Sequence, residues 1–234
     1  LIQDALLGVY LLSAATLSRA DAMQIAQAPS GVTGREIIST VLPKVTYERG
    51  GVKIVEGVFL EGRLRKKDVG KSNGSLVHII FNDFGSDACV DFIFNLQGLA
   101  HRYLQVRGFT IGIKDLVRTK EATDVCNREK VAAFEEAKHL KNPNIRLNNC
   151  RAIMGKAVMK DMGDENNFYC MVNSGSKGSI VNITQVQSAL GQMNVVGGRI
   201  PMHWKDRTAT EFKRGDTSPE ALGFVASSYL DGLS

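Results

Sequence analysis

The segment Gly175-Ser176-Lys177-Gly178-Ser179 has the strongest potential for chemistry in the sequence. Glycines on both sides let the backbone approach another group closely, and the hydroxyl and N–H groups can bind an anion. Lys177 adds a positive charge at the centre. The spacing does not match the Walker A loop, which requires Gly-x-x-x-x-Gly-Lys-Ser/Thr after a strand. The segment therefore predicts either an anion contact or a flexible surface turn.

Further polar groups follow this segment. Asn182 and Gln185 come first, and Gly191-Gln192 and Gly197-Gly198-Arg199 come next. They place uncharged hydrogen-bonding groups near two cations, although a polar surface crossed by turns would have the same composition. A separate basic cluster, Arg63-Leu64-Arg65-Lys66-Lys67, is either a phosphate contact or a solvated strand end. It lacks the interleaved aromatic residues on which single-stranded nucleic acid stacks.

The patterns of common catalytic and metal sites are missing from the sequence. It contains no Gly-x-Ser-x-Gly elbow, no cysteine with a histidine-partner signature and no Asp-x-Asp-x-Asp cluster for two magnesium ions. It also has no Cys-x-x-Cys pair and no His-x-x-x-His pair, and a structural zinc site normally has ligands close in sequence. We therefore expect no metal site and no catalytic residue. The cysteines are expected to be buried free thiols, which suits a reducing compartment; they are Cys89, Cys126, Cys150 and Cys170.

Composition narrows the class of protein. A chain of 234 residues suggests one large domain or two small ones, and 44% hydrophobic with 23% charged residues argues against wholesale disorder. The net charge of +5 permits contact with phosphates without requiring it. The uncharged apolar stretch 5–18 is shorter than the roughly 20 residues of a membrane span, so no transmembrane helix is expected. Because the chain begins inside an apolar pattern, we expect the middle of a longer polypeptide and not a signal peptide.

The elements that must position these residues are of mixed type. Helices are predicted over 2–12, from the capping pattern at Ser18 through Ala26, and from the capping box at Thr33 to Pro43. Pro29 and Gly31 are expected to separate the second helix from the third. Strands are predicted over 45–47, 52–55 and 58–60, with a hairpin turn at 48–51.

The middle of the chain is predicted to be mainly helical, whereas the last seventy residues mix Gly, Ser and Gln with short apolar stretches. The apolar run 76–81 is either a strand or a buried helix, and Ser86 is expected to cap the strongest helix, which ends at Gly108. After an extended crossing at 109–113, a domain boundary is expected near 119–122. Helices are predicted over 127–140 and 149–162. The fold class is therefore α+β, a mixed domain with short strands and helices followed by a mainly helical domain.

Several blocks of sequence carry a more specific signal. In order, they are IQD at 2–4 with LG at 7–8, VGKSNGSLVH at 69–78, GFTIGI at 108–113, MVNSGSKGSIVNITQ at 171–185, GQ at 191–192, GGRI at 197–200, DRT at 206–208, SPE at 218–220, GFV at 223–225 and SYLDGL at 228–233. These blocks resemble, in the same order, the largest subunit of multisubunit DNA-directed RNA polymerases of the eukaryotic or large DNA virus type. The resemblance covers most of the chain and is weak over about 13–45 and 119–167.

The resemblance implies a fragment of two parts. Residues 1–118 would form the pore domain, which is largest-subunit domain 3, and residues 119–234 the funnel domain, which is domain 4. In this family these parts line the secondary channel, through which nucleoside triphosphates enter and backtracked RNA leaves. The implied partners are the other polymerase subunits, especially the second-largest, together with template DNA, RNA, nucleoside triphosphates and a transcript-cleavage factor, with no membrane. The implied location is intracellular, in the nucleus or cytoplasm, including an infected cell or a virion.

The resemblance also implies roles for single residues. Lys177 would approach the triphosphate of the incoming nucleotide. The residues expected to line the channel or face the mobile trigger loop are Ser176, Asn182, Gln185, Gln192 and Arg199. The family's Asn-Ala-Asp-Phe-Asp-Gly-Asp magnesium loop is absent from the chain, as are the bridge helix and the trigger loop. The fragment alone is therefore expected to be inactive and to bind no cofactor, and Mg²⁺ would belong to the complete enzyme.

The chain departs from the family pattern at three places. It reads Arg207-Thr208-Ala209-Thr210-Glu211-Phe212 where the family continues Arg-Thr-Leu-Pro-His-Phe, and Gln192-Met193 where relatives often have Gln-Gln. The segment 149–157 keeps little of the usual funnel helix, which puts binding of mushroom-toxin-like inhibitors in doubt. This divergence resembles that of a large DNA virus polymerase.

Two other functions are compatible with the residues. The alternative to a polymerase fragment is a non-enzymatic module that binds nucleic acid or a factor through the basic cluster, with steeply salt-dependent binding. A stand-alone nucleotide-binding enzyme is disfavoured, because the carboxylate cluster and the phosphate loop that it would need are both missing.

Overall fold

The chain forms two compact units. The computed structural model describes residues 1–27 and 33–233, and the expected break at Pro29 and Gly31 lies outside them. The first unit consists of Leu1–Ile111 and Tyr169–Lys177, and the second of Gly112–Phe168 and Gly178–Ser234. The units are therefore interleaved in sequence, whereas the predicted division into 1–118 and 119–234 is contiguous.

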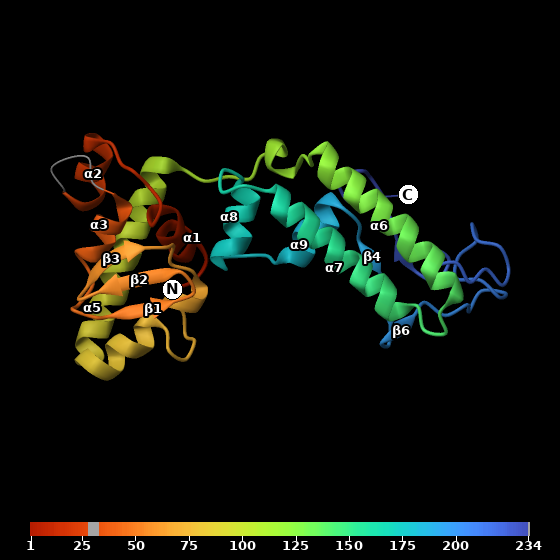
Figure 1. Cartoon of the computed structure of the whole chain (residues 1–234), viewed down its shortest axis with the longest axis horizontal. Coiled ribbons are helices and arrows are strands. Elements are labelled where there is room, and N and C mark those ends of the chain that lie inside the picture. Colours follow the sequence, from red (N-terminus) through yellow and green to blue (C-terminus); the bar gives the residue numbers. More distant parts are fainter. Residues whose placement is uncertain (28–32, 234) are drawn as a thin grey trace. The chain divides into compact units, whose positions relative to one another are not determined.

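The first unit combines short helices, a small sheet and one long helix (Figure 1). Its elements are α1 (Gln3–Leu12), α2 (Arg19–Ala26), α3 (Gly34–Ser39), β1 (Tyr47–Arg49), β2 (Val52–Val55), β3 (Val58–Glu61), α4 (Lys66–Val69), α5 (Leu76–Arg107) and most of α8 (Asn167–Ser174). The three strands form an antiparallel sheet in the order β1-β2-β3, in which Tyr47 faces Ile54. The first strand begins two residues later than predicted.

The predicted caps of the short helices are confirmed. The Ser18 hydroxyl accepts a hydrogen bond from the Asp21 N–H at 3.2 Å. Thr33 and Glu36 form a reciprocal capping box, in which each side chain accepts from the other residue's backbone N–H. The ambiguous run at 76–81 is helical and opens α5. At Gly85, with φ 87° and ψ 176°, the long helix kinks, and helical geometry resumes from Ser86, where the sequence predicts a new helix.

The core of the first unit lies between α1 and α5. A Cβ on Gly8 would lie 2.7 Å from the Ala100 carbonyl oxygen, so the two helices approach more closely than any larger residue at this position would allow. Around this crossing the apolar side chains of both helices are buried together with those of the sheet. Tyr10, on α1, has no exposed surface. Its position in this core decides where its hydroxyl group points.

The second unit is mainly helical. Its elements are η1 (Ile113–Leu116), α6 (Lys120–His139), α7 (Asn144–Asp161), the start of α8, α9 (Ile180–Gln187), and the two-residue strands β4 (Gly191–Gln192), β5 (Asn194–Val195), β6 (Gly198–Arg199) and β7 (Phe224–Val225). Helices α6 and α7 run side by side as a hairpin in Figure 1, and α7 also packs on α9. Strand β4 pairs with β7, and β5 pairs with β6. The predicted α+β class, with a mixed first part and a mainly helical second part, is confirmed.

The predicted starts of α6 and α7 are wrong. The helices begin at Lys120 and Asn144, whereas the sequence predicts starts at 127 and 149. The first turns of α6 are polar, so their apolar periodicity is weak. Thr119 stabilises them as an N-cap, because its hydroxyl accepts from the Ala122 N–H at 3.2 Å.

All four cysteines are buried thiols, as predicted. No helix among the described residues is both long and apolar enough to cross a membrane.

Candidate functional site

The segment that carries Lys177 is a tight turn directly after α8. The buried Ser174 hydroxyl donates to the Met171 carbonyl at 2.9 Å and accepts from the Ser176 N–H at 3.2 Å. Gly175 has φ 78° and Gly178 φ 75°, which a residue with a side chain rarely adopts. The Lys177 side chain is exposed. The turn is therefore fixed at its base and presents its cation to solvent.

This turn lies against the basic cluster 63–67. A Cβ on Gly175 would approach the Lys66 Cβ to 2.7 Å, so glycine is required for the contact. The cluster forms the start of α4, where the Arg65 N–H donates to the Asp68 carboxylate at 2.9 Å. Lys66 and Lys67 are exposed. The structure thus brings together two cationic segments that are more than one hundred positions apart in sequence, which the sequence analysis treats as separate features.

The buried Tyr10 side chain links the two segments through hydrogen bonds to its hydroxyl group. Its hydroxyl accepts from Asn173 Nδ2 at 2.9 Å and from Arg63 Nη1 at 3.4 Å. The Arg63 guanidinium carbon also lies 5.2 Å from the centre of the Tyr10 ring, within the range of a cation–π interaction. The sequence analysis misses Tyr10 and Asn173 as site residues. The Tyr10 position reads as ordinary core, and no local pattern indicates that its hydroxyl reaches a segment from the far end of the chain.

A buried phenol–carboxylate pair stabilises the cluster. Tyr47 Oη donates to Asp68 Oδ1 at 2.8 Å, and Asp68 has no exposed surface. Burial, and then the hydrogen bond to the Asp68 carboxylate, raise the pKa of Tyr47 well above its ordinary value of 10. Asp68 in turn caps α4 at Arg65, so the pair fixes the helix that carries Lys66 and Lys67.

This pair gives a pH-dependent prediction. As pH rises through about 10, tyrosine ionises in the unfolded chain, while Tyr47 in the folded chain keeps its proton. The folded state therefore binds more protons, and the free energy of unfolding should fall as pH increases above about 10. We expect Tyr47→Phe to make this decline shallower, as measured by urea unfolding between pH 8 and pH 11. The exposed Tyr229→Phe is the control, and an equally steep decline in wild type and Tyr47→Phe would contradict the assignment.

The remaining predicted site residues lie in the second unit. Asn182 and Gln185 are on α9, where Asn182 is exposed and its amide oxygen accepts from the Ser179 N–H at 2.8 Å as part of the helix cap. Gln185 is half-buried. Gln187 fixes the helix, because its Nε2 donates to the Asp115 carbonyl at 3.0 Å. Ser176 and Lys177 belong to the first unit, so the structure does not group all the predicted residues in one unit.

Gln192 and Arg199 are more buried than a surface role requires. Gln192 is 4% exposed, and its Nε2 donates to the carbonyls of Met193 and Leu222 at 2.7 and 2.9 Å. Arg199 is half-buried, and Nη2 donates to the Ser218 carbonyl at 3.3 Å. Burial lowers the pKa of Arg199. Within the second unit, both side chains tie the β-strand region to the segment 218–222.

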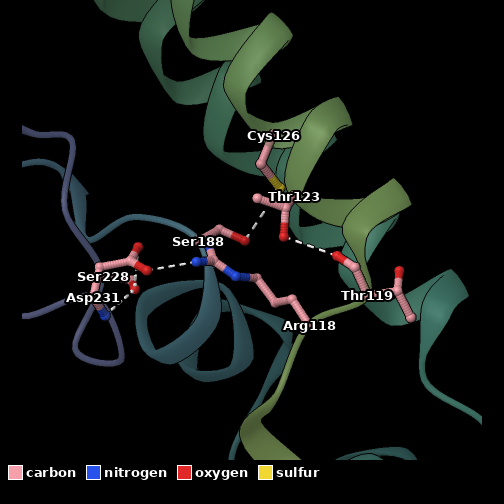
Figure 2. Close-up of polar contacts among 7 residues, drawn as sticks. All are labelled: Arg118, Thr119, Thr123, Cys126, Ser188, Ser228 and Asp231. Carbon is pink, nitrogen blue, oxygen red and sulfur yellow. Dashed lines mark hydrogen bonds and ion pairs between the residues drawn. The ribbon is translucent and has the colours of Figure 1, made fainter.

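The end of the described chain is anchored to the start of α6. Figure 2 shows Arg118 pointing toward Asp231, with 2.5 Å between Nη2 and Oδ1. The second Asp231 carboxylate oxygen accepts from the Ser228 hydroxyl at 2.8 Å (Figure 2). Nearby, the Cys126 thiol and the Ser188 hydroxyl lie 3.5 Å apart. These contacts are structural, since Arg118, just before α6, is joined to the segment after β7, and Cys126 of α6 is joined to Ser188 at the end of α9.

The described residues offer no obvious place for a metal. Among them, no group of three or more histidine, cysteine, aspartate or glutamate side chains is placed to hold an ion. The first unit presents exposed ammonium groups on a fixed turn and on a capped helix, and such groups can contact a polyanion without forming a covalent bond to it.

Comparison with known proteins matches each part of the chain to a described protein family. Residues 1–116 match the family described as RNA polymerase Rpb1, domain 3, and residues 114–225 match RNA polymerase Rpb1, domain 4. A relative is the DNA-directed RNA polymerase II subunit RPB1-B of Trypanosoma brucei brucei, which is 31% identical over 235 residues. That similarity covers 86% of this chain and 13% of the relative, so the chain spans about an eighth of the relative's length.

Proposed function

Because the chain belongs to the RNA polymerase Rpb1 family and spans domains 3 and 4 of a largest subunit, we propose that it works as part of a DNA-directed RNA polymerase. In this proposal it lines the secondary channel of the enzyme, through which nucleoside triphosphates enter and backtracked RNA leaves. The two family matches follow one another along the chain and leave few residues unmatched. The proposal therefore concerns the whole chain and not one motif.

The observation that carries the proposal is the exposed Lys177 on its fixed turn beside Lys66. We propose that the Lys177 ammonium contacts the triphosphate of the incoming nucleotide. At about 4 Å, one charge pair is worth roughly 1 kcal/mol in water and about 4 kcal/mol near a protein surface. Phosphoryl transfer depends mainly on positioning and on neutralising charge, so a pre-positioned cation is suited to it.

The other predicted residues have supporting roles in this proposal. Ser176 would donate hydrogen bonds beside Lys177, and Asn182 and Gln185 would face the channel or the trigger loop from α9. The buried amide of Gln192 and the half-buried Arg199 are better suited to shaping the channel wall, because Gln192 Nε2 and Arg199 Nη2 already donate to backbone carbonyls. Mg²⁺ would be held by other parts of the complete enzyme.

The partners and location follow from the same proposal. The chain would assemble with the other polymerase subunits, among them the second-largest, and would meet template DNA, RNA and a transcript-cleavage factor only in that assembly. It would work inside the cell, in the nucleus or the cytoplasm. The virus-like character of the sequence stays a prediction.

One observation favours the alternative function, a non-enzymatic binding module. Lys66 and Lys67 are exposed on the basic cluster, which is the surface that a nucleic-acid-binding or factor-binding module would use. Such a module would bind nucleic acid as an isolated chain, with an affinity that falls steeply with salt.

One experiment separates the two functions. The polymerase proposal predicts that the protein, tagged and purified from its source, carries other polymerase subunits and incorporates labelled nucleotide on a DNA template with Mg²⁺. It also predicts that the isolated chain incorporates none and binds RNA or DNA weakly in filter assays at 50–200 mM salt, a range over which phosphate-contacting proteins change greatly in affinity. Purification without polymerase subunits, together with tight salt-dependent binding by the isolated chain, would establish the binding module instead.

A further inference from the structure

A pocket in the second unit has a basic lining that includes Arg199, and the proposed function names no ligand for it. Its volume is about 540 Å³, within the range of roughly 300–1,000 Å³ that is typical of small-molecule sites. It lies where the end of α6 and the turn to α7 meet Arg199 of β6 and the segment 217–222. All of these residues belong to the second unit, so the pocket does not depend on where the first unit sits.

The charge of Arg199 is not compensated in this pocket. Its Nη2 donates to the carbonyls of Ser218 and Pro219, at 3.3 and 3.5 Å, which are long contacts. Its Nε is buried and has no hydrogen-bond partner among residues 1–27 and 33–233. None of the described carboxylates forms an ion pair with this guanidinium. Partial burial of a guanidinium without an acidic partner costs free energy, and an anion bound in the pocket would offset that cost.

The other lining groups favour an anion with an apolar body. Lys141 is exposed at the pocket, while Lys138 already pairs with Glu135 at 2.7 Å. Thr217 adds a hydroxyl, and Leu140 and Leu222 add apolar surface.

The acid that directly precedes the lining segment in sequence is directed elsewhere. Asp216 precedes the lining segment, and its carboxylate accepts from the Ser218 N–H at 2.9 Å. Hydrogen bonds from Ser218 lower the pKa of Asp216, and the ion pairs among the described residues do not include one between Asp216 and Arg199.

We propose that this pocket binds a small organic anion. Its phosphate or carboxylate group pairs with Arg199 and Lys141, and its apolar part packs against Leu140 and Leu222. A modest rotation of the Arg199 guanidinium would let the anion accept the Nε proton that no described residue accepts. Guanidinium groups favour such planar oxyanions because they present several N–H donors in a fixed geometry.

The test follows the Arg199 Nε–H signal in a ¹H–¹⁵N spectrum of the purified chain, identified by its absence in Arg199→Lys. Phenyl phosphate and benzoate are titrated separately, with inorganic phosphate and with sodium chloride at matched ionic strength. We expect the signal to move saturably with at least one aromatic anion, which binds more tightly than inorganic phosphate. Comparing the two aromatic anions distinguishes phosphate from carboxylate as the preferred group.

Matched variants make the result decisive. Lys141→Gln should raise the Kd for the preferred anion at least threefold, whereas Lys160→Gln, an exposed lysine on α7 outside the pocket, should leave it unchanged. Because Arg199→Lys lacks the signal that reports binding, it serves to identify that signal, and Lys141→Gln tests the assignment. A signal that follows ionic strength alone, or equal affinity in wild type and Lys141→Gln, would overturn the proposal. Because the readout is binding by the chain alone, its failure would leave the polymerase proposal standing.

Discussion

Replacing Lys177 with alanine in the assembled polymerase is expected to raise the KM for nucleoside triphosphate about tenfold. This corresponds to about 1.4 kcal/mol, toward the lower end of the range for one partly solvated charge pair. The effect should be greatest at low triphosphate concentration, because a missing phosphate contact weakens binding of the substrate. The measurement is the rate of template-directed RNA synthesis across a triphosphate titration.

Two variants sharpen this test. Lys44→Ala removes another exposed lysine of the first unit, outside the site, and should leave the titration unchanged. Lys177→Arg keeps the charge and should recover part of the lost affinity. If Lys177→Ala has the same KM and kcat as wild type, Lys177 does not contact the triphosphate.

Truncating Tyr10 to alanine is expected to have the largest effect on stability. A fully buried aromatic residue typically contributes about 3–5 kcal/mol relative to alanine, and here the loss also removes the partner of Asn173 and Arg63. Hydrogen exchange measured by mass spectrometry should show faster exchange in peptides from α1 and α5. Peptides from α6 and α7, in the second unit, provide an internal control. Unchanged exchange in α1 would refute the role of Tyr10 in this core.

Tyr10→Phe separates packing from positioning. It keeps the buried ring and removes only the hydroxyl group, so the loss of stability should be about 1–2 kcal/mol. Because Asn173 then loses its link to α1, the turn that carries Lys177 should become less well fixed. We expect KM for triphosphate to rise while kcat changes little. Full activity in Tyr10→Phe would mean that the Asn173 contact does not position the turn.

Much of the fold could be predicted from local sequence, because its determinants are local. The caps at Ser18 and Thr33 and the hairpin between β1 and β2 depend on neighbouring residues; the caps form where predicted, and the hairpin forms with its first strand two residues later. The start of α6 could not be placed, because its first turns are polar and depend on the Thr119 cap. The run at 76–81 stayed ambiguous because short buried strands and helices share one apolar pattern.

The candidate site was predictable in part. The glycine-flanked Lys177 and the basic cluster 63–67 could be recognised from residue type and spacing. Their proximity could not, since it arises when residues 169–177 join the first unit and Asn173 reaches Tyr10. The burial of Gln192 was likewise not predictable, because the carbonyl of Leu222 that it binds comes from a distant segment. Contacts of long sequence separation leave no periodic signal.

The most direct test of the central claim is a labelling experiment on the assembled enzyme. A nucleoside triphosphate with an amine-reactive group on its γ-phosphate is bound in the presence of template, and the modified lysines are identified by mass spectrometry. The account predicts that Lys177 is labelled and that excess unmodified triphosphate prevents the labelling. Labelling of other lysines with Lys177 unmodified, or labelling of Lys177 that excess triphosphate does not reduce, would contradict it.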